Sequence, residues 1–308
     1  MLPEPEPVPE EPLTPAGLED LPWFSESWHN LPWSPWVPFT AEKHAFRAIP
    51  VEPGVYRIRP AGNDFLMYIG ETNRALYQRL NELRQSLRRP DLMPWNDPDT
   101  SAPALWAWRD AEAYEYECSA APLDASPAGR RVMKSFLLYR YRQEFGESTP
   151  CNFGRFHPRY RRSTNKSENL RGGKLAIGQK DNPAGGAGMS PLCPAENPGD
   201  TRWMGITWSV NQDLAAETSG SVSPGPGLMV LSDAATGEIL FIGQSMDCRK
   251  RLLDQCRKNW EGRTVQFSYH IPEAPVLQHN LRELETDLIG NFFEQNRKAP
   301  EFQFRTSH

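Results

Sequence analysis

The stretch GVYRIRPAGNDFLMYIGETN, residues 54–73, contains two short β-prone segments, GVYRIR and FLMYIG, joined by the turn-forming sequence PAGND. This pattern predicts a β-hairpin. Tyr56 lies in the first segment, Tyr68 lies in the second, and Gly70 follows closely. A hairpin that only had to be soluble would not need two tyrosines and a glycine in these places, so their arrangement indicates a function.

The residues that follow this hairpin predict a helix, a strand and a further helix. Leucines recur at helical spacing through residues 75–87, which predicts an amphipathic helix there. A strand is expected at residues 114–118, and a further helix is expected over residues 129–145. Strands and helices therefore alternate around the hairpin.

The second half of the chain repeats this plan, which indicates an internal duplication. Residues 227–245 again predict a hairpin, followed by a helix, a strand and a helix over residues 248–260, 264–271 and 280–295. The spacing is the same in both copies: Gly54 and Gly70 are 16 residues apart, as are Gly227 and Gly243, and an Arg-Leu pair follows each hairpin. Upstream, Trp36 and Trp208 lie 18 and 19 residues before Gly54 and Gly227, so we expect them to be equivalent.

The order GVY, YIG and then Arg-Leu on the next helix resembles the GIY-YIG nuclease family. The resemblance covers most of residues 36–155 and 208–305. It implies an α+β fold of two modules, each a small three-stranded antiparallel sheet flanked by helices. It also implies cleavage of DNA phosphodiester bonds with a divalent metal, Mg²⁺ or Mn²⁺. We therefore expect a DNA endonuclease of the restriction or genome-defence type. The alternative is a catalytically inactive tandem protein that binds DNA or a partner.

The resemblance also assigns residues of the N-terminal copy. Tyr56 is the candidate general base, and Tyr68 would bind phosphate or position the attacking water. Arg79 would stabilise charge in the transition state, and Asn152 would orient the site. Lys134 stands where the family carries a metal-binding glutamate.

The C-terminal copy departs from the family in the opposite way. Met229 and Phe241 replace the two tyrosines and carry no ionisable proton. Glu285 matches the family's glutamate, Arg251 matches Arg79, and Gln303 stands at the position of Asn152. We therefore expect catalysis in the N-terminal copy, and DNA binding or an architectural role in the C-terminal copy.

The loss of the glutamate at Lys134 raises the question of what holds the metal. A different carboxylate, Glu71 or Glu144, is one possibility, and Glu285 reaching across from the other copy is another. The third is that the Lys134 ammonium itself stands in place of the ion. We expect a replacement carboxylate, because lysine cannot bind and activate a water as a metal does.

Charge is unevenly distributed along the chain. The net charge is −5, and residues 1–20 contain six acidic and no basic residues, so the remainder has a net charge of +1. A basic run with interleaved aromatic residues at 155–174 is typical of a nucleic-acid contact. Its basic residues, all expected to bind DNA, are Arg155, Arg159, Arg161, Arg162, Lys166, Arg171 and Lys174.

The domain organisation predicted from these features has four parts. They are an acidic, Pro-rich and disordered arm (1–30), an N-terminal module (31–175), a Gly/Pro-rich linker (176–200) and a C-terminal module (201–308). No apolar run approaches the ~20 residues of a membrane span, and five cysteines without a CxxC motif argue against a zinc cluster. We therefore expect a cytoplasmic protein with DNA as partner, no membrane contact and a possible homodimer.

Overall fold

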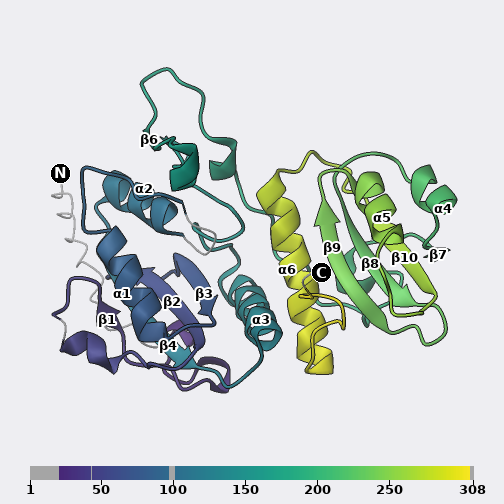
Figure 1. Cartoon of the computed structure of the whole chain (residues 1–308), viewed down its shortest axis with the longest axis horizontal. Helices are drawn as coiled ribbons and strands as arrows, with labels where there is room; N and C mark the ends of the chain where they lie inside the picture. The colour runs from purple at the N-terminus through teal and green to yellow at the C-terminus, as the bar shows by residue number, and fades with distance from the viewer. Residues whose placement is uncertain (1–20, 43, 97–100, 306–308) are drawn as a thin grey trace, which may run out of the picture.

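The computed structural model describes residues 21–42, 44–96 and 101–305. The fold is α+β, as predicted, with one four-stranded antiparallel sheet in each half of the chain. The long helices α3 (Pro127–Phe145) and α6 (Gln278–Asn296) lie side by side between the two sheets (Figure 1). The acidic residues 1–20 lie outside the described residues.

The N-terminal sheet has the strand order β1-β4-β2-β3. The predicted hairpin is β2 and β3, and its register places Tyr56 opposite Gly70. The strand expected at 114–118 begins at Tyr116 and continues through small buried residues to Pro122, which the sequence pattern did not reveal. The bounds are β1 Val37–Pro38, β2 Gly54–Pro60, β3 Tyr68–Thr72, β4 Tyr116–Pro122, α1 Leu76–Ser86 and α2 Ala102–Glu112.

The C-terminal sheet has the corresponding order β7-β10-β8-β9. Each sheet has four strands where three were expected, because the two-residue edge strands β1 and β7 are too short to give a periodic signal. The bounds are β7 Gln212–Asp213, α4 Ala216–Ser221, β8 Gly227–Asp233, β9 Ile239–Ser245, α5 Cys248–Cys256 and β10 Val265–His270. The short elements are β5 Tyr160–Arg161, β6 Gly173–Lys174, and 3-10 turns at Pro22–Phe24, Trp28–Asn30, Ala45–Ala48, Lys166–Glu168, Pro183–Gly185 and Trp203–Gly205.

A tryptophan pair precedes each sheet and corrects one predicted equivalence. Trp33 Nε1 donates to the carbonyl oxygen of Trp28 at 2.9 Å, and Trp208 Nε1 donates to that of Trp203 at 3.2 Å. Trp208 is therefore the counterpart of Trp33, and the predicted pairing with Trp36 is wrong. The shared motif is Trp-x-x-x-x-Trp-Ser, at residues 28–34 and 203–209.

The serine of this motif holds the sheet in both halves. Ser34 Oγ accepts from the backbone N–H of Ala120 at 3.1 Å, and Ser209 Oγ accepts from that of Tyr269 at 3.0 Å. Ala120 lies on β4 and Tyr269 on the corresponding strand β10. The same side chain therefore fixes the same strand twice.

Helices α3 and α6 pack around an approximate two-fold relation. Tyr139 packs over Gly290, where an added Cβ would lie 2.3 Å from Tyr139 Cβ, so glycine permits the close approach. Arg142 pairs with Asp287 at 2.8 Å on one side of this contact. Phe136 and Phe293, the pair related by the same two-fold relation, have ring centroids 5.4 Å apart.

One predicted segment boundary needs correction. Residues 21–30 are not part of a disordered arm, because Trp23 and Trp28 are buried in the N-terminal core. The predicted linker at residues 176–200 makes hydrogen bonds to the C-terminal half. The N–H of Met189 donates to Glu283 at 2.7 Å, and the N–H of Leu192 donates to Asp287 at 3.0 Å, so this segment is bound to α6. Within the described residues, no helix combines the length and apolar character of a membrane span.

Candidate active site

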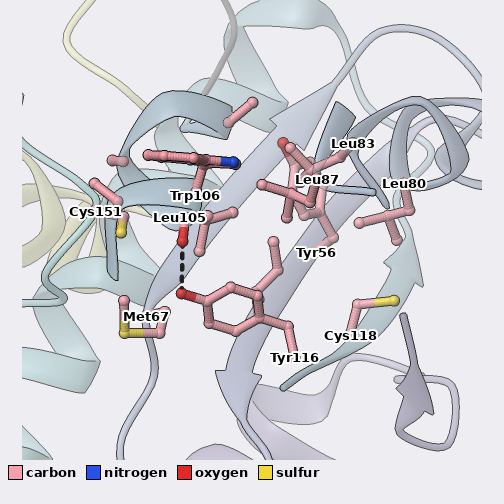
Figure 2. Close-up of a cluster of buried hydrophobic side chains, with 14 of the residues drawn as sticks. Tyr56, Met67, Leu80, Leu83, Leu87, Leu105, Trp106, Tyr116, Cys118 and Cys151 are labelled. Carbon is pink, nitrogen blue, oxygen red and sulfur yellow. Dashed lines mark hydrogen bonds between the residues drawn. The ribbon is translucent and has the colours of Figure 1, made fainter. Parts of the chain in front are cut away.

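Tyr56 lies at the centre of the N-terminal core, with its hydroxyl directed at an arginine. Its side chain is fully buried against leucines of α1, including Leu80 and Leu83 (Figure 2). The hydroxyl accepts a hydrogen bond from Arg79 Nε at 3.3 Å. A Cβ at Gly70 would lie 2.3 Å from Tyr56 Cζ, so the glycine lets the tyrosine ring cross the neighbouring strand. This contact explains why the hairpin carries a glycine after Tyr68.

Tyr68 is half-buried beside Tyr56, with ring centroids 5.9 Å apart. Burial raises the pKa of Tyr56, and the nearby Arg79 charge acts in the opposite direction. Burial raises the pKa of Tyr68 well above its usual value, and the neighbouring Tyr56 adds to this effect. Both residues are therefore neutral phenols at neutral pH.

Asn152 holds the strand that carries Tyr68. Its Oδ1 accepts from the N–H of Ile69 at 2.9 Å, and its Nδ2 donates to the carbonyl of Ile69 at 2.9 Å. Gln303 makes the same pair of bonds to Ile242, at 2.9 Å and 2.9 Å. We call these two arrangements the amide clamps. They place Asn152 and Gln303 at equivalent positions.

Two adjoining cavities lie next to the tyrosine pair. The first, of about 360 Å³, adjoins Tyr68 and is called the tyrosine cavity. The second, of about 460 Å³, lies between the two halves of the chain and is called the interface cavity. Five residues line both: Glu71, Lys134, Asn152, Phe153 and Arg282.

Lys134 and Glu285, which the sequence analysis places at corresponding positions of the two halves, both line the interface cavity. Both side chains are half-buried. Burial raises the pKa of Glu285 to about 7, against the effect of the nearby Arg282 and Arg251 charges. Glu285 does not line the tyrosine cavity, so it meets Lys134 and Glu71 only in the interface cavity.

Glu71 is the carboxylate best placed for a metal ion. Its Oε2 atom is buried and has no hydrogen-bond partner, and the residue lines both cavities. In the part of the chain that the structure describes, no three His, Cys, Asp or Glu side chains gather as a metal-binding group. Mg²⁺ is nevertheless commonly held by one or two carboxylates together with substrate phosphates and water. The donor set around Glu71 fits such a site.

The predicted alternative ligand Glu144 does not fit. Its Oε2 accepts from Trp28 Nε1 at 2.9 Å, and its Oε1 lies 3.2 Å from both His29 Nε2 and Arg140 Nη2. It lines neither cavity. The Glu144 carboxylate instead holds the segment that contains Trp28 and His29 against α3. Residue 144 lies near the C-terminal end of α3, beyond the α3 residues that line the cavities.

The C-terminal half carries Met229 and Phe241 where the N-terminal half carries Tyr56 and Tyr68. Met229 and Phe241 are buried in the core of the second sheet. Arg251 lies 6.0 Å from the Phe241 ring centroid, whereas Arg79 donates a hydrogen bond to the Tyr56 hydroxyl. Arg251 and Phe241 both line the interface cavity.

Much of the basic run at 155–174 is committed to contacts within the chain. Arg155 lies 3.4 Å from Glu283, and Arg159 pairs with Asp181 at 2.6 Å. Arg171 donates to the carbonyl of Met93 at 2.6 Å and stacks 3.8 Å from the Trp95 ring centroid. The expectation that the whole run contacts DNA is therefore too broad.

The other basic residues of the run differ in position. Arg162 lines the tyrosine cavity, and its Nη2 donates to the carbonyl of Gly154 at 3.2 Å. Arg161, Lys166 and Lys174 are exposed. Four residues of the run thus remain accessible to a ligand, one of them inside the tyrosine cavity.

Arg282 is a cavity residue that the sequence analysis missed. It lies on α6, one turn before Glu285, and an i,i+3 spacing places two side chains on one face of a helix. That spacing was the available signal.

No protein-family model, no curated protein and no solved structure matches this chain.

Proposed function

We propose that this chain is a DNA endonuclease that hydrolyses phosphodiester bonds at the tyrosine cavity. The observation that supports the proposal is the assembly of Tyr56, Tyr68 and Arg79 beside Glu71, whose buried oxygen lacks a partner. Phosphoryl transfer needs a positioned water and stabilisation of charge on the phosphoryl oxygens. Hydroxyl, carboxylate and cationic groups that can serve these needs line a single cavity.

The two tyrosines have different roles in this proposal. Tyr68 lines the cavity, so its hydroxyl can hydrogen-bond to the attacking water or to a phosphate oxygen. Tyr56 is buried behind it and takes part through its ring contact with Tyr68 and its hydrogen bond with Arg79. Because burial raises both pKa values, Tyr68 acts as a base only when added positive charge in the cavity stabilises its phenolate.

The cations of the tyrosine cavity supply part of this positive charge. Lys134 and Arg162 both line it, where they stabilise negative charge on phosphoryl oxygens. Glu71 would hold a Mg²⁺ or Mn²⁺ ion, which when bound lowers the pKa of a coordinated water. Asn152 keeps β3, and with it Tyr68, in place through its amide clamp.

Two observations favour a second candidate, a catalytically inactive protein that binds nucleic acid through the same cavity. Lys134 replaces the carboxylate of the family, and the two tyrosines have raised pKa values. Neutral phenols and cations suffice to bind a phosphate. Binding without cleavage would be the signature of this candidate.

Incubation of supercoiled plasmid with the protein and Mg²⁺ or Mn²⁺ tests the proposal. The wild-type protein is expected to nick or linearise the plasmid, and excess chelator or Glu71→Gln is expected to stop the reaction. Glu144→Gln is the matched control, because that carboxylate lies outside both cavities. Plasmid that is bound but stays supercoiled with either metal would replace the proposal by the inactive candidate.

A further inference from the structure

Arg282 brings a positive charge from the C-terminal half into the N-terminal site. It lies on α6, yet it lines the tyrosine cavity, whose other lining residues all lie between Tyr68 and Arg162 in the chain. It also lines the interface cavity beside Glu285. The tyrosine cavity is therefore built from both halves of the chain.

The position of Arg282 depends on the loop that follows the N-terminal amide clamp. Arg282 Nη1 donates to the carbonyl of Phe153 at 3.2 Å. Gly154 has a φ of 81°, and an added Cβ there would lie 2.3 Å from Arg282 Nη1. Glycine thus serves twice at this residue, because it adopts the left-handed conformation and leaves room for the guanidinium.

The charges around Arg282 favour an anion. Among the described residues that line the tyrosine cavity, Arg282 and Arg162 bring positive charge beside the carboxylate of Glu71. A guanidinium has five N–H donors, so the bond to Phe153 leaves Arg282 able to bind two phosphate oxygens at once. Phe153 also lines the cavity and is half-buried, so its ring can contact a base.

We propose that Arg282 completes a phosphate-binding site for a single nucleic-acid strand, so that the N-terminal site is whole only in the presence of the C-terminal half. The identity of the strand as substrate rests on the proposed function, whereas the anion site itself does not. In this arrangement the C-terminal half, which lacks both tyrosines, contributes a cation to the site of its neighbour.

The test measures binding separately from cleavage. A fluorescein-labelled thymidine oligonucleotide of about 12 nucleotides, a length within the usual site sizes for single strands, is titrated by anisotropy in excess chelator over a salt series. Arg282→Gln is the main variant, because it keeps a donor for the Phe153 carbonyl and removes the charge. It is expected to raise Kd about tenfold and to reduce the magnitude of the salt slope by about 0.7, the value for one phosphate contact on a single strand.

Two further variants separate charge from structure. Arg282→Lys keeps the charge, so the wild-type salt slope is expected to persist while the bidentate contact is lost. Lys250→Ala removes an exposed charge on α5 that lines neither cavity, and wild-type affinity is expected. Thermal unfolding of each variant checks that the fold is kept.

The outcomes distinguish this inference from the proposed function. Wild-type affinity and salt slope in Arg282→Gln would overturn the inference, even if the wild-type protein cleaves plasmid. Arg282-dependent binding by a wild-type protein that cleaves nothing would support the inference and overturn the endonuclease. A wild-type protein that does not bind the oligonucleotide would overturn the inference, while the plasmid assay would still decide the endonuclease.

Discussion

The two halves of the chain hold the hairpin in the same way but present different groups to the cavities. Asn152 clamps Ile69 and Gln303 clamps Ile242, each with two bonds of 2.9 Å. Next to the clamped residue, Tyr68 in one half corresponds to Phe241 in the other. Both halves have a side-chain amide that bonds to the backbone of the hairpin. Phe241, in contrast, lacks the ring hydroxyl of Tyr68, and the C-terminal sheet still forms.

This difference separates what the fold requires from what it does not. A Tyr ring and a Phe ring fill similar volumes, so the core can form with either. The hydroxyl pair of Tyr56 and Tyr68, with Arg79 against it, is therefore an addition that the fold itself does not demand. We therefore expect the function to depend on these two hydroxyls, and the following experiments test which residues serve the fold and which serve the function.

The largest expected effect is on stability, at the charged contact between the halves. Arg142→Leu would leave Asp287 buried without its partner, and removal of one partner of a buried pair costs about 3–5 kcal/mol. Urea unfolding would measure the change. The matched control is Phe136→Leu, at the related apolar contact, with an expected cost of about 1 kcal/mol. Equal costs for the two variants would contradict the difference we describe between the two contacts.

The second effect is on cleavage. Tyr68→Phe gives the N-terminal site the residue found in the C-terminal half, and loss of a group that acts in the transition state costs about 10²–10³-fold in rate. The fold is expected to remain, with a thermal midpoint close to wild type. Single-turnover cleavage of plasmid measures the rate. Full activity in this variant would show that the hydroxyl is dispensable, as it is in the other half.

The amide clamps give a third, smaller effect that should be alike in both halves. Asn152→Ala and Gln303→Ala each leave a backbone N–H and carbonyl without their partner, at a cost of about 1–3 kcal/mol. Denaturant unfolding measures both costs. Only Asn152→Ala should also slow cleavage, because its clamp holds β3 beside Tyr68. A cleavage defect in Gln303→Ala that matches the defect in Asn152→Ala would break the distinction between the halves.

The smallest effect concerns pH and Glu285. Burial raises its pKa from 4.5 to about 7, so the folded state binds this proton more tightly than the unfolded state does. The resulting stabilisation is fully present below pH 4.5 and is lost as the pH rises through about 7. Relative to Glu285→Gln, the wild-type protein should therefore lose stability between about pH 5 and about pH 8.

Urea midpoints of both proteins at the two pH values check this prediction. Glu273→Gln, at an exposed position outside both cavities, is the control and should follow the wild-type protein. Parallel pH dependence in the wild-type protein and Glu285→Gln would show that Glu285 does not titrate in this range.

The hairpins and the main helices followed from local patterns in the sequence. Period-2 and helical spacing are set by neighbouring residues, so β2, β3, α1 and α3 could be predicted. The equivalence of residues 152 and 303 also followed from spacing, and the two amide clamps agree with it. The predicted equivalence of Trp36 and Trp208 is wrong because the segment between the Trp-x-x-x-x-Trp-Ser motif and the hairpin differs in length between the two halves.

The roles of the arginines could not be predicted in the same way. Arg171 bonds to the carbonyl of Met93, and Arg282 reaches the carbonyl of Phe153, far away in the chain. A count of charges shows neither partner. The sequence identified positive charge at 155–174, but only the fold decides which guanidinium groups are used internally and which line a cavity.

The contact between α3 and α6 also determines which surfaces can pair. Residues 142 and 287 are oppositely charged, while the related residues 136 and 293 are both phenylalanine. If two N-terminal halves from different molecules paired in this way, Arg142 would face Phe136 and a charge would be buried without a partner, at a cost that opposes the exchange. The same mismatch would place Asp287 against Phe293 in a pair of C-terminal halves. Each half of the chain therefore pairs more favourably with the other half than with a second copy of itself. Because the two halves lie in one chain, their sequences can also differ from each other, which those of identical subunits cannot.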